Sequence, residues 1–299
     1  MLVLNQRFFS LGKSYNFLSK NLNKLPLFNG SSEIENGEFK KYLNYFNYNF
    51  NDNSKEKNGY IIFKDKKIVF IMDIGNSPDF KYSKRYQSGC LSFELISNSE
   101  KLICNSGFGL EKNHKMKLLS RTTAAHSTLY LNNHSSCSFK KNYLFEFNKE
   151  KPLQRGLKIL NKQIIFEKNF ENIVASHNGY KNKYGYIHER SIKFIKKEKI
   201  LMGKDSLIKN NNAINAFFGI RFHIYPGIKM VKTKNSQSIL LSLNNGDGWK
   251  FNCLNHEIII EKGIFFGNKH KVINNENIYI SGMTNGENQV IKWSFEKIS

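Results

Sequence analysis

The sequence is poor in the residues that define several specialised classes of protein. Among 299 residues there are only 4 prolines, 4 cysteines and 20 glycines, which excludes collagen-like chains and proline-rich linkers. The cysteines are too few and too widely spaced for a disulfide scaffold, and no CxxC pair indicates structural zinc. They are Cys90, Cys104, Cys137 and Cys253. No stretch approaches the roughly 18 apolar residues of a membrane-crossing helix, so we predict no transmembrane segment.

Acidic residues are also scarce, with 24 Asp and Glu against 46 Lys and Arg, a formal net charge of +22. Such a balance favours polyanionic partners, namely nucleic acid, anionic lipid or acidic polysaccharide. An AT-rich genome would also enrich any protein in Lys, Asn and Ile, so charge alone does not choose a partner. The chain has no helix-turn-helix and no RNP-type aromatic pattern, and we therefore expect no nucleic-acid partner.

The first 24 residues have the periodicity of an amphipathic helix. Apolar side chains recur at steps of four and three, at Leu4, Phe8, Leu11, Tyr15, Leu18 and Leu22. Polar residues interrupt any apolar core of a leader, so we predict no signal peptide in this chain. Pro26 ends the helix. The apolar stripe needs a partner, which is either the following domain or a helical domain of which residues 1–26 are the last helix.

Residues 27–58 form a connector rich in Asn, Tyr and Phe, which we expect to be a loop or a short irregular helix. After it, the hydrophobicity pattern changes to short apolar or alternating runs. Residues 60–63 and 68–72 flank a charged turn, which predicts a hairpin. Further strands are expected at 91–95, 101–104, 127–131, 144–147, 164–167, 172–175, 191–195, 218–223, 238–243, 249–253, 258–261, 277–280 and 289–295. Many short strands without a long helix between them predict an all-β fold, a large antiparallel β-sandwich over residues 59–299.

Three polar clusters interrupt these strands. The first is residues 121–128, with Arg121 and His126, and the second is 176–180, followed by Tyr184, His188 and Arg190. In the third, 218–223, alternation places Arg221 and His223 on one face. Arginine grips carboxylate or sulfate in bidentate fashion, and Tyr and His move protons, so together they suit an anionic sugar. The alternative for the third cluster is a buried polar pair inside the sandwich, and a lone histidine is more often structural than a ligand.

Five segments occur in an order that resembles a known family. They are 27–30 (LFNG), 89–95 (GCLSFEL), 121–129 (RTTAAHSTL), 176–180 (SHNGY) and 220–227 (IRFHIYPG). Together they resemble the C-terminal part of heparinase II/III-like proteins of proteobacteria, over about residues 3–298. The resemblance implies an N-terminal (α/α) toroid followed by the sandwich, lyase chemistry on uronic-acid polysaccharide such as glycosaminoglycan, and a place in the cell envelope or periplasm.

The resemblance also assigns positions residue by residue. Family lyases have a His-x-His-x-Asp segment before the LSF strand, and here Arg85, Gln87 and Gly89 stand at those positions. The resemblance thus implies that Arg85 replaces a candidate catalytic histidine, that Gln87 replaces a metal ligand of the zinc-bearing members, and that Asn105 replaces an aspartate ligand. His126 alone remains of the three metal positions. Because neutral amides are poor zinc ligands, we expect no cofactor and no tightly held zinc, only a degenerate metal position at His126.

Two functions follow as expectations. The first is lyase-type β-elimination on acidic polysaccharide, incomplete in this chain because the toroid, which a separate polypeptide would have to supply, is not in it. The second is a non-catalytic sandwich that binds acidic glycans or assists assembly. The catalytic candidates are His126, Tyr180 and His223. The candidates for binding substrate are Arg85, Gln87, Asn105, Arg121, His177, His188, Arg190 and Arg221.

Overall fold

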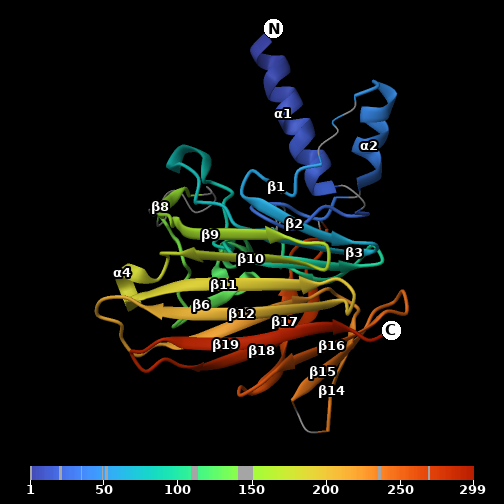
Figure 1. Ribbon diagram of the computed structural model, residues 1–299. Coiled ribbons are helices and arrows are strands. Elements are labelled where there is room, and N and C mark those ends of the chain that lie inside the picture. Colours follow the sequence, from blue (N-terminus) through green and yellow to red (C-terminus); the bar gives the residue numbers. More distant parts are fainter. Residues whose placement is uncertain are drawn as a thin grey trace.

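The computed structural model describes residues 2–19, 22–34, 36–48, 50, 53–108, 114–140, 151–234, 237–268 and 270–299. Two antiparallel sheets pack face to face, and two N-terminal helices lie at one end of them (Figure 1). The prediction of a large antiparallel β-sandwich is confirmed. No helix in the described part of the chain is long and apolar enough to cross a membrane.

The first sheet has the order β1-β2-β3-β4-β5-β13-β18-β17, and β6 also pairs with β13. Its strands are β1 (Glu56–Lys57), β2 (Tyr60–Asp65), β3 (Ile68–Asp73), β4 (Phe93–Ser97), β5 (Glu100–Cys104), β6 (Leu129–Leu131), β13 (Phe217–Ile224), β17 (Ile258–Phe265) and β18 (Ile273–Met283). The predicted hairpin over residues 60–72 is β2 and β3, paired from Tyr60↔Asp73 to Asp65↔Ile68. This hairpin positions the site described below.

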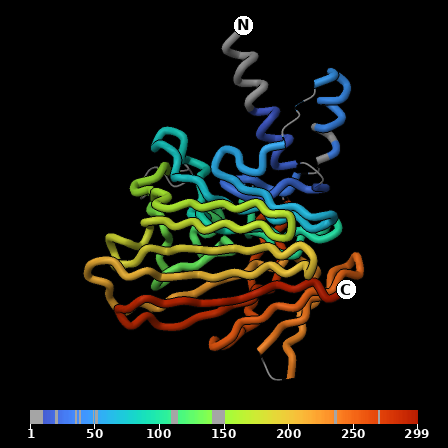
Figure 2. The backbone as a smooth tube through the Cα atoms, viewed as in Figure 1, coloured from blue at the N-terminus to red at the C-terminus, as the bar shows by residue number. Residues whose placement is uncertain are grey.

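The second sheet has the order β14-β15-β16-β19-β12-β11-β10-β9. Its strands are β9 (Ile159–Phe166), β10 (Phe170–His177), β11 (Tyr186–Ile195), β12 (Ile200–Lys209), β14 (Lys229–Lys232), β15 (Ser238–Ser242), β16 (Gly248–Cys253) and β19 (Gln289–Lys297). Figure 2 shows β9, β10, β11, β12 and β19 side by side across the front of the molecule. A small third sheet pairs β7 (Ser138–Phe139) with β8 (Leu153–Arg155).

The helices are few among the described residues, and the first, with 18 residues, is the longest of them. They are α1 (Leu2–Ser19), α2 (Asn36–Tyr45), α3 (His114–Ser120) and α4 (Lys181–Tyr184), with 3-10 turns η1 (Phe80–Tyr82) and η2 (Thr123–Ala125). The C-terminal end of α1 lies on the sandwich, because Leu18 packs against the cluster that contains Val69 and Ile71, whereas Leu11 is 70% exposed. The side chains of Leu4 and Phe8, which belong to the predicted stripe, lie outside the described residues.

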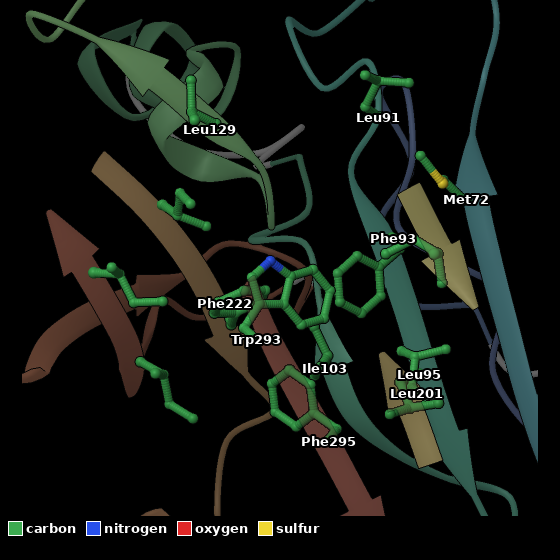
Figure 3. Close-up of a cluster of buried hydrophobic side chains, with 14 of the residues drawn as sticks. Met72, Leu91, Phe93, Leu95, Ile103, Leu129, Leu201, Phe222, Trp293 and Phe295 are labelled. Atoms are coloured by element: carbon green, nitrogen blue, oxygen red, sulfur yellow. The ribbon is translucent and has the colours of Figure 1, made fainter. Parts of the chain in front are cut away.

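Aromatic side chains from both sheets fill the space between them. The indole of Trp293 stacks on Phe93 with ring centroids 5.6 Å apart, and Phe222 lies 4.7 Å from the same indole (Figure 3). Gly203 on β12 pairs with Trp293, and a Cβ at Gly203 would lie 2.1 Å from that ring. The close approach of strand and indole therefore requires glycine at this position.

The outer face of β2, β3 and β4 is covered by the chain that follows α1. Leu22 and Phe28 pack there against Val69, Ile71 and Ile96. The turn at residues 27–30 is thereby brought to the start of β2, which is where the candidate site lies.

Most predicted strands are present, with boundaries shifted by a few residues. Residues 91–95, for example, precede and overlap β4, which begins at Phe93. Strands β12 and β14 and the short strands β1, β7 and β8 were not predicted. The strand expected at 144–147 lies outside the described residues. The missed β12 carries Gly203, Lys204 and Asp205 in its centre, a sequence that ordinarily disfavours a buried strand.

Candidate functional site

A cavity of about 250 Å³ opens where the turn at residues 27–30 meets the ends of β2 and β3. Its lining residues are mostly polar or aromatic. They are Asn29, Asn58, Tyr60, Asp73, Gly75, Asn76, Pro78, Tyr82, Arg85 and Tyr86. A polar, aromatic hollow with one cation is the kind of surface that holds a sugar bearing a negative charge.

Three of these residues share hydrogen bonds. The amide nitrogen Nδ2 of Asn29 donates to the Tyr60 hydroxyl at 2.9 Å and to Asp73 Oδ2 at 3.0 Å. Asp73 Oδ1 accepts from the backbone N–H of Gly75 at 3.0 Å. Burial of Asp73 raises its pKa to about 7, although both hydrogen bonds act in the opposite direction. Burial, reinforced by Asp73, also raises the pKa of Tyr60, so its phenol stays neutral.

Arg85 is the cation of the cavity, and it is exposed. The backbone approaches it closely at Gly30, which has a φ of +85° and where a Cβ would lie 2.8 Å from the Cβ of Arg85. Both the left-handed backbone and the missing side chain at Gly30 are therefore needed.

The buried Arg121 holds the segment on either side of Arg85. Its guanidinium donates to the carbonyl of Ser83 at 3.0 Å, of Tyr86 at 2.9 Å and of Lys151 at 2.6 Å, and it lies 3.7 Å from the Phe139 ring centroid. Since Arg121 is only 3% exposed, its donors are directed at the protein itself. We interpret it as a residue that positions Arg85, rather than one that touches a ligand.

Gln87 and Asn105, for which the resemblance implies metal-ligand positions, are buried beneath this surface. The side-chain oxygen of Gln87 accepts from Gly30 N–H at 2.9 Å, and its nitrogen donates to the Ser120 carbonyl at 2.6 Å. The side-chain oxygen of Asn105 accepts from Ser127 N–H at 3.0 Å. Both amide oxygens are therefore directed at backbone N–H groups.

His126 lies in the same buried layer. Its Nδ1 is 2.8 Å from the Thr122 carbonyl, which can only accept, so Nδ1 carries the proton. Its Nε2 is buried and has no hydrogen-bond partner among the described residues. Burial lowers the pKa of His126 to about 4, and the ring is neutral near pH 7. Gly89 lies against it, because a Cβ there would come within 2.5 Å of the imidazole.

These residues do not fit a zinc ion. One imidazole nitrogen and two amides with engaged oxygens are a poor donor set, since zinc takes thiolate, imidazole or carboxylate. In the described part of the chain, no group of three His, Cys, Asp or Glu side chains is arranged to hold a metal. No step of the proposed chemistry runs through a metal.

His223 is buried beside His126, on the face of β13 opposite the inter-sheet core. Its Nδ1 is 3.2 Å from Ser106 Oγ and its Nε2 is 3.0 Å from the Ala124 carbonyl. Burial, followed by the charge of Arg221, lowers the pKa of His223 to about 3. Arg221 lies on the same face, where it pairs with Glu261.

The remaining predicted residues lie inside the sandwich. Arg190 forms a bidentate pair with Asp205, at 2.7 Å from Nε to Oδ1 and 2.9 Å from Nη2 to Oδ2. Its Nη1 donates to the carbonyls of Leu91 at 2.8 Å and Ser127 at 2.7 Å, both of which belong to the other half of the sandwich. Trp293 Nε1 donates to Asp205 at 2.8 Å. Each of the three nitrogens of the buried guanidinium thus has at least one acceptor.

A histidine pair extends this buried network. Gly179 N–H donates to His177 Nδ1 at 3.0 Å, so the His177 proton is on Nε2, which lies 3.2 Å from His188 Nδ1. His188 Nε2 in turn donates to Asp205 at 2.7 Å. Burial lowers the pKa of both histidines, and they are neutral near pH 7. Burial alone would raise the pKa of Asp205, but Arg190 and His188 outweigh it and lower that pKa.

Tyr180 is 1% exposed, and its hydroxyl donates to the Leu129 carbonyl at 3.0 Å. Like His126 and His223, it does not line the cavity. The catalytic roles of these three residues stay predictions. Of the predicted substrate-binding residues, Arg85 alone is among those that line the cavity.

Tyr60 and Asp73 were not predicted as site residues, and Asn29 was noted only as part of the LFNG segment of the connector. A signal for Asp73 is present, since a carboxylate closes the apolar run Ile68–Asp73, and a charge at the end of a buried strand requires partners. The pairing of Tyr60 with Asp73 follows once residues 60–73 are a hairpin.

The fold and this cavity define a class of protein, an antiparallel β-sandwich with a polar hollow on the covered face of one sheet. Residues 49–294 match the family described as Heparinase II/III-like, C-terminal, so the chain belongs to that family, which is a polysaccharide lyase family. The resemblance inferred from the five ordered segments is confirmed. No curated protein matches the chain.

Several solved structures have the same fold as this chain. A mutant of the heparan sulfate lyase HepC from Pedobacter heparinus has a TM-score of 0.74 and 16% identity, over 95% of this chain and 45% of that one. A heparinase III, the BT4657 gene product, has a TM-score of 0.71 and 15% identity, over 92% and 43%. Another heparinase III has a TM-score of 0.68 and 15% identity, over 97% and 47%. The chain thus spans less than half the length of these solved proteins.

Proposed function

We propose that this chain is the sandwich part of a lyase-type protein that processes acidic, uronic-acid polysaccharide, and that the cavity beside Arg85 binds the charged sugar. The observation that carries the proposal is the position of Arg85. It borders a cavity with Asn29, Tyr60 and Asp73. The family resemblance further implies that Arg85 replaces the first histidine of the His-x-His-x-Asp segment. Heparan sulfate, named for the similar HepC, is one polymer of this class.

The chemistry needs a neutralised carboxylate and a route for two protons. In β-elimination a base takes the proton at C5 of the uronate, a C4–C5 double bond forms, and the C4–O bond breaks. Arg85 would pair with the sugar carboxylate and make the C5 proton more acidic. Asp73, with a pKa of about 7, is suited to take that proton. The neutral hydroxyl of Tyr60 would protonate the departing oxygen, and exchange with water would restore both groups.

We also propose that a helical polypeptide completes the site. Aromatic side chains at the end of α2 are exposed, 48% for Tyr42, 81% for Tyr45 and 50% for Phe46, which is typical of a surface that another element covers. Since the similar solved proteins are more than twice as long, a toroid is the partner of the right kind. A place in the cell envelope or periplasm fits a protein that meets such polymers.

The test is an assay of uronic-acid polymers for the ultraviolet absorbance of the unsaturated product, with the chain alone and with a toroid polypeptide added. Arg85→Ala should weaken substrate binding at least about tenfold, because a hydrogen-bonded charge pair is worth about 1.5–3 kcal/mol and each 1.4 kcal/mol is tenfold. Arg155→Ala is the matched control, since Arg155 is exposed and does not line the cavity. Unsaturated product that forms equally with and without Arg85 would refute the site.

The second candidate function is binding of acidic glycans without turnover. The observation that favours it is the burial of the four histidines His126, His177, His188 and His223, which leaves no histidine among the described residues of the cavity. Salt-sensitive binding that depends on Arg85, with no unsaturated product even when a toroid is supplied, would select this function over the lyase.

A further inference from the structure

A second hollow lies at the opposite end of the β2–β3 hairpin from the cavity at Arg85. It has a volume of about 580 Å³ and is lined by Lys64, Lys66 and Lys67 of the hairpin turn, together with Asn98, Ser99 and Asn245 from two other turns. It adjoins a smaller hollow of about 370 Å³, with which it shares Ile96, Asn98, Ser99 and Asn245. The three turns thus line one continuous groove.

The larger hollow is positive, because no carboxylate is among its lining residues and all three lysines are exposed. Asp65 stands between Lys64 and Lys66 in the hairpin but is not among the lining residues. Two acidic residues beside the other turns accept hydrogen bonds within the protein. Asp247 accepts from Ser97 Oγ, from Asn98 Nδ2 at 2.7 Å and from Lys297 at 2.7 Å. Glu100 accepts from the backbone N–H of Asn245 at 3.0 Å. The side chains that line the larger hollow thus include three lysines and no carboxylate.

The turns that form the hollow are held in place relative to one another. Lys66, Asn98 and Ser99 have positive φ angles of 47°, 49° and 67°, which is typical of tight hairpin turns. Asn98 N–H donates to the Lys67 carbonyl at 2.9 Å, and Asn245 Nδ2 donates to the Ser97 carbonyl at 3.0 Å. Because Asn245 follows a strand of the second sheet, these bonds join turns of both sheets into one preformed surface.

From this geometry we infer that the lysine hollow is a second binding site for the same acidic polysaccharide, which holds a sulfo or carboxylate group on a sugar away from the cavity at Arg85. The inference rests on the proposed function. Lys66 lies six positions after Tyr60, and an extended strand rises about 3.3 Å per residue, so the two sites are ~20 Å apart along the hairpin. A polymer, unlike a short sugar, can reach both of them, and simultaneous contact at two sites raises its affinity.

The experiment uses the full chain with Lys66→Glu and Lys67→Glu combined. The control is Lys181→Glu with Lys183→Glu, an equal change of charge on the exposed helix α4. Both are titrated with a fluorescent sulfated uronic-acid oligosaccharide long enough to span ~20 Å, and with a sulfated disaccharide. We expect the first variant to bind the long oligosaccharide at least about tenfold more weakly, with a smaller dependence on salt, because two cation–anion pairs are lost. Disaccharide binding and the control should change less than about twofold.

A second measurement locates the ligand directly. Lysine labelling by an amine-reactive reagent, read by mass spectrometry, should show Lys66 and Lys67 protected by the long oligosaccharide and Lys181 and Lys183 not protected. Absence of protection, while Arg85→Ala still weakens binding, would overturn this inference and leave the proposed function intact. Protection at Lys66 and Lys67 with no effect of Arg85→Ala on binding would instead overturn the proposed site at Arg85 and leave the lysine hollow as a binding site. Tighter binding of a single-stranded DNA of equal charge would also overturn it.

Discussion

The pKa of Asp73 leads to a specific prediction about stability. Asp73 is 4% exposed, and burial raises its pKa to about 7 from an ordinary value of 3.8. The replacement Asp73→Asn keeps the shape of the side chain and removes its ionisation. The amide can still accept from Gly75 N–H, but its nitrogen would face the donor of Asn29, so we expect a pH-independent loss of about 1 kcal/mol.

The sign of the pH dependence follows from the raised pKa. In the unfolded chain the carboxyl loses its proton near pH 4, whereas in the folded protein it keeps the proton up to about pH 7. Wild-type stability from this group is therefore complete at low pH and is lost as the pH rises through 4 to 7. A tenfold difference in proton affinity is worth about 1.4 kcal/mol, so the whole effect is on the order of 4 kcal/mol.

The assay is urea unfolding of both proteins at several pH values between 4 and 8. The free energy of unfolding of Asp73→Asn should rise relative to wild type by most of this ~4 kcal/mol across the range, so that the variant becomes the more stable protein at pH 8. Asp79→Asn, which removes an exposed carboxylate, controls for the change of net charge. A constant difference between wild type and Asp73→Asn at all pH values would refute the reasoning.

Three further predictions concern the core and the loop at Arg85. Gly203→Ala places a Cβ 2.1 Å from Trp293 and should cost about 1–3 kcal/mol in urea unfolding, whereas Gly37→Ala, which meets nothing within 4 Å, should not destabilise. Asp205→Asn leaves the Arg190 guanidinium without its carboxylate, and a loss of about 3–5 kcal/mol is expected; an unchanged midpoint would contradict the network. Arg121→Lys cannot make the three carbonyl contacts, so amide exchange at residues 83–86 should accelerate and glycan binding should weaken, while Arg155→Lys changes neither.

The sequence predicts the architecture well because period-two alternation is a local signal. The hairpin of β2 and β3 and most other strands follow from it directly. Alternation does not predict strand β12, because Gly203 and Asp205 are residue types typical of turns. Their places in the strand are explained only by their partners Trp293 and Arg190. Those partners are distant in the sequence, and pairings at such range have no local signature.

The candidate site is predicted less completely, for a related reason. Residue type identifies arginine and histidine as suited to an anionic sugar, but it does not tell an arginine whose donors meet backbone carbonyls, like Arg121, from one at a cavity, like Arg85. Likewise the chemistry of His188 is decided by Asp205, a neighbour on the adjacent strand. Exposure depends on tertiary packing, which alternation along one strand does not report.

The contacts of Arg190 have a consequence for how the sandwich assembles. One guanidinium reaches Asp205 in its own sheet and the carbonyls of Leu91 and Ser127 across the interior. A half-assembled state, with the sheets apart but water already expelled, would contain a cation without its full set of acceptors, at a steep energetic penalty. The two layers should therefore form and separate as one cooperative unit, without a populated intermediate in which only one of them is ordered.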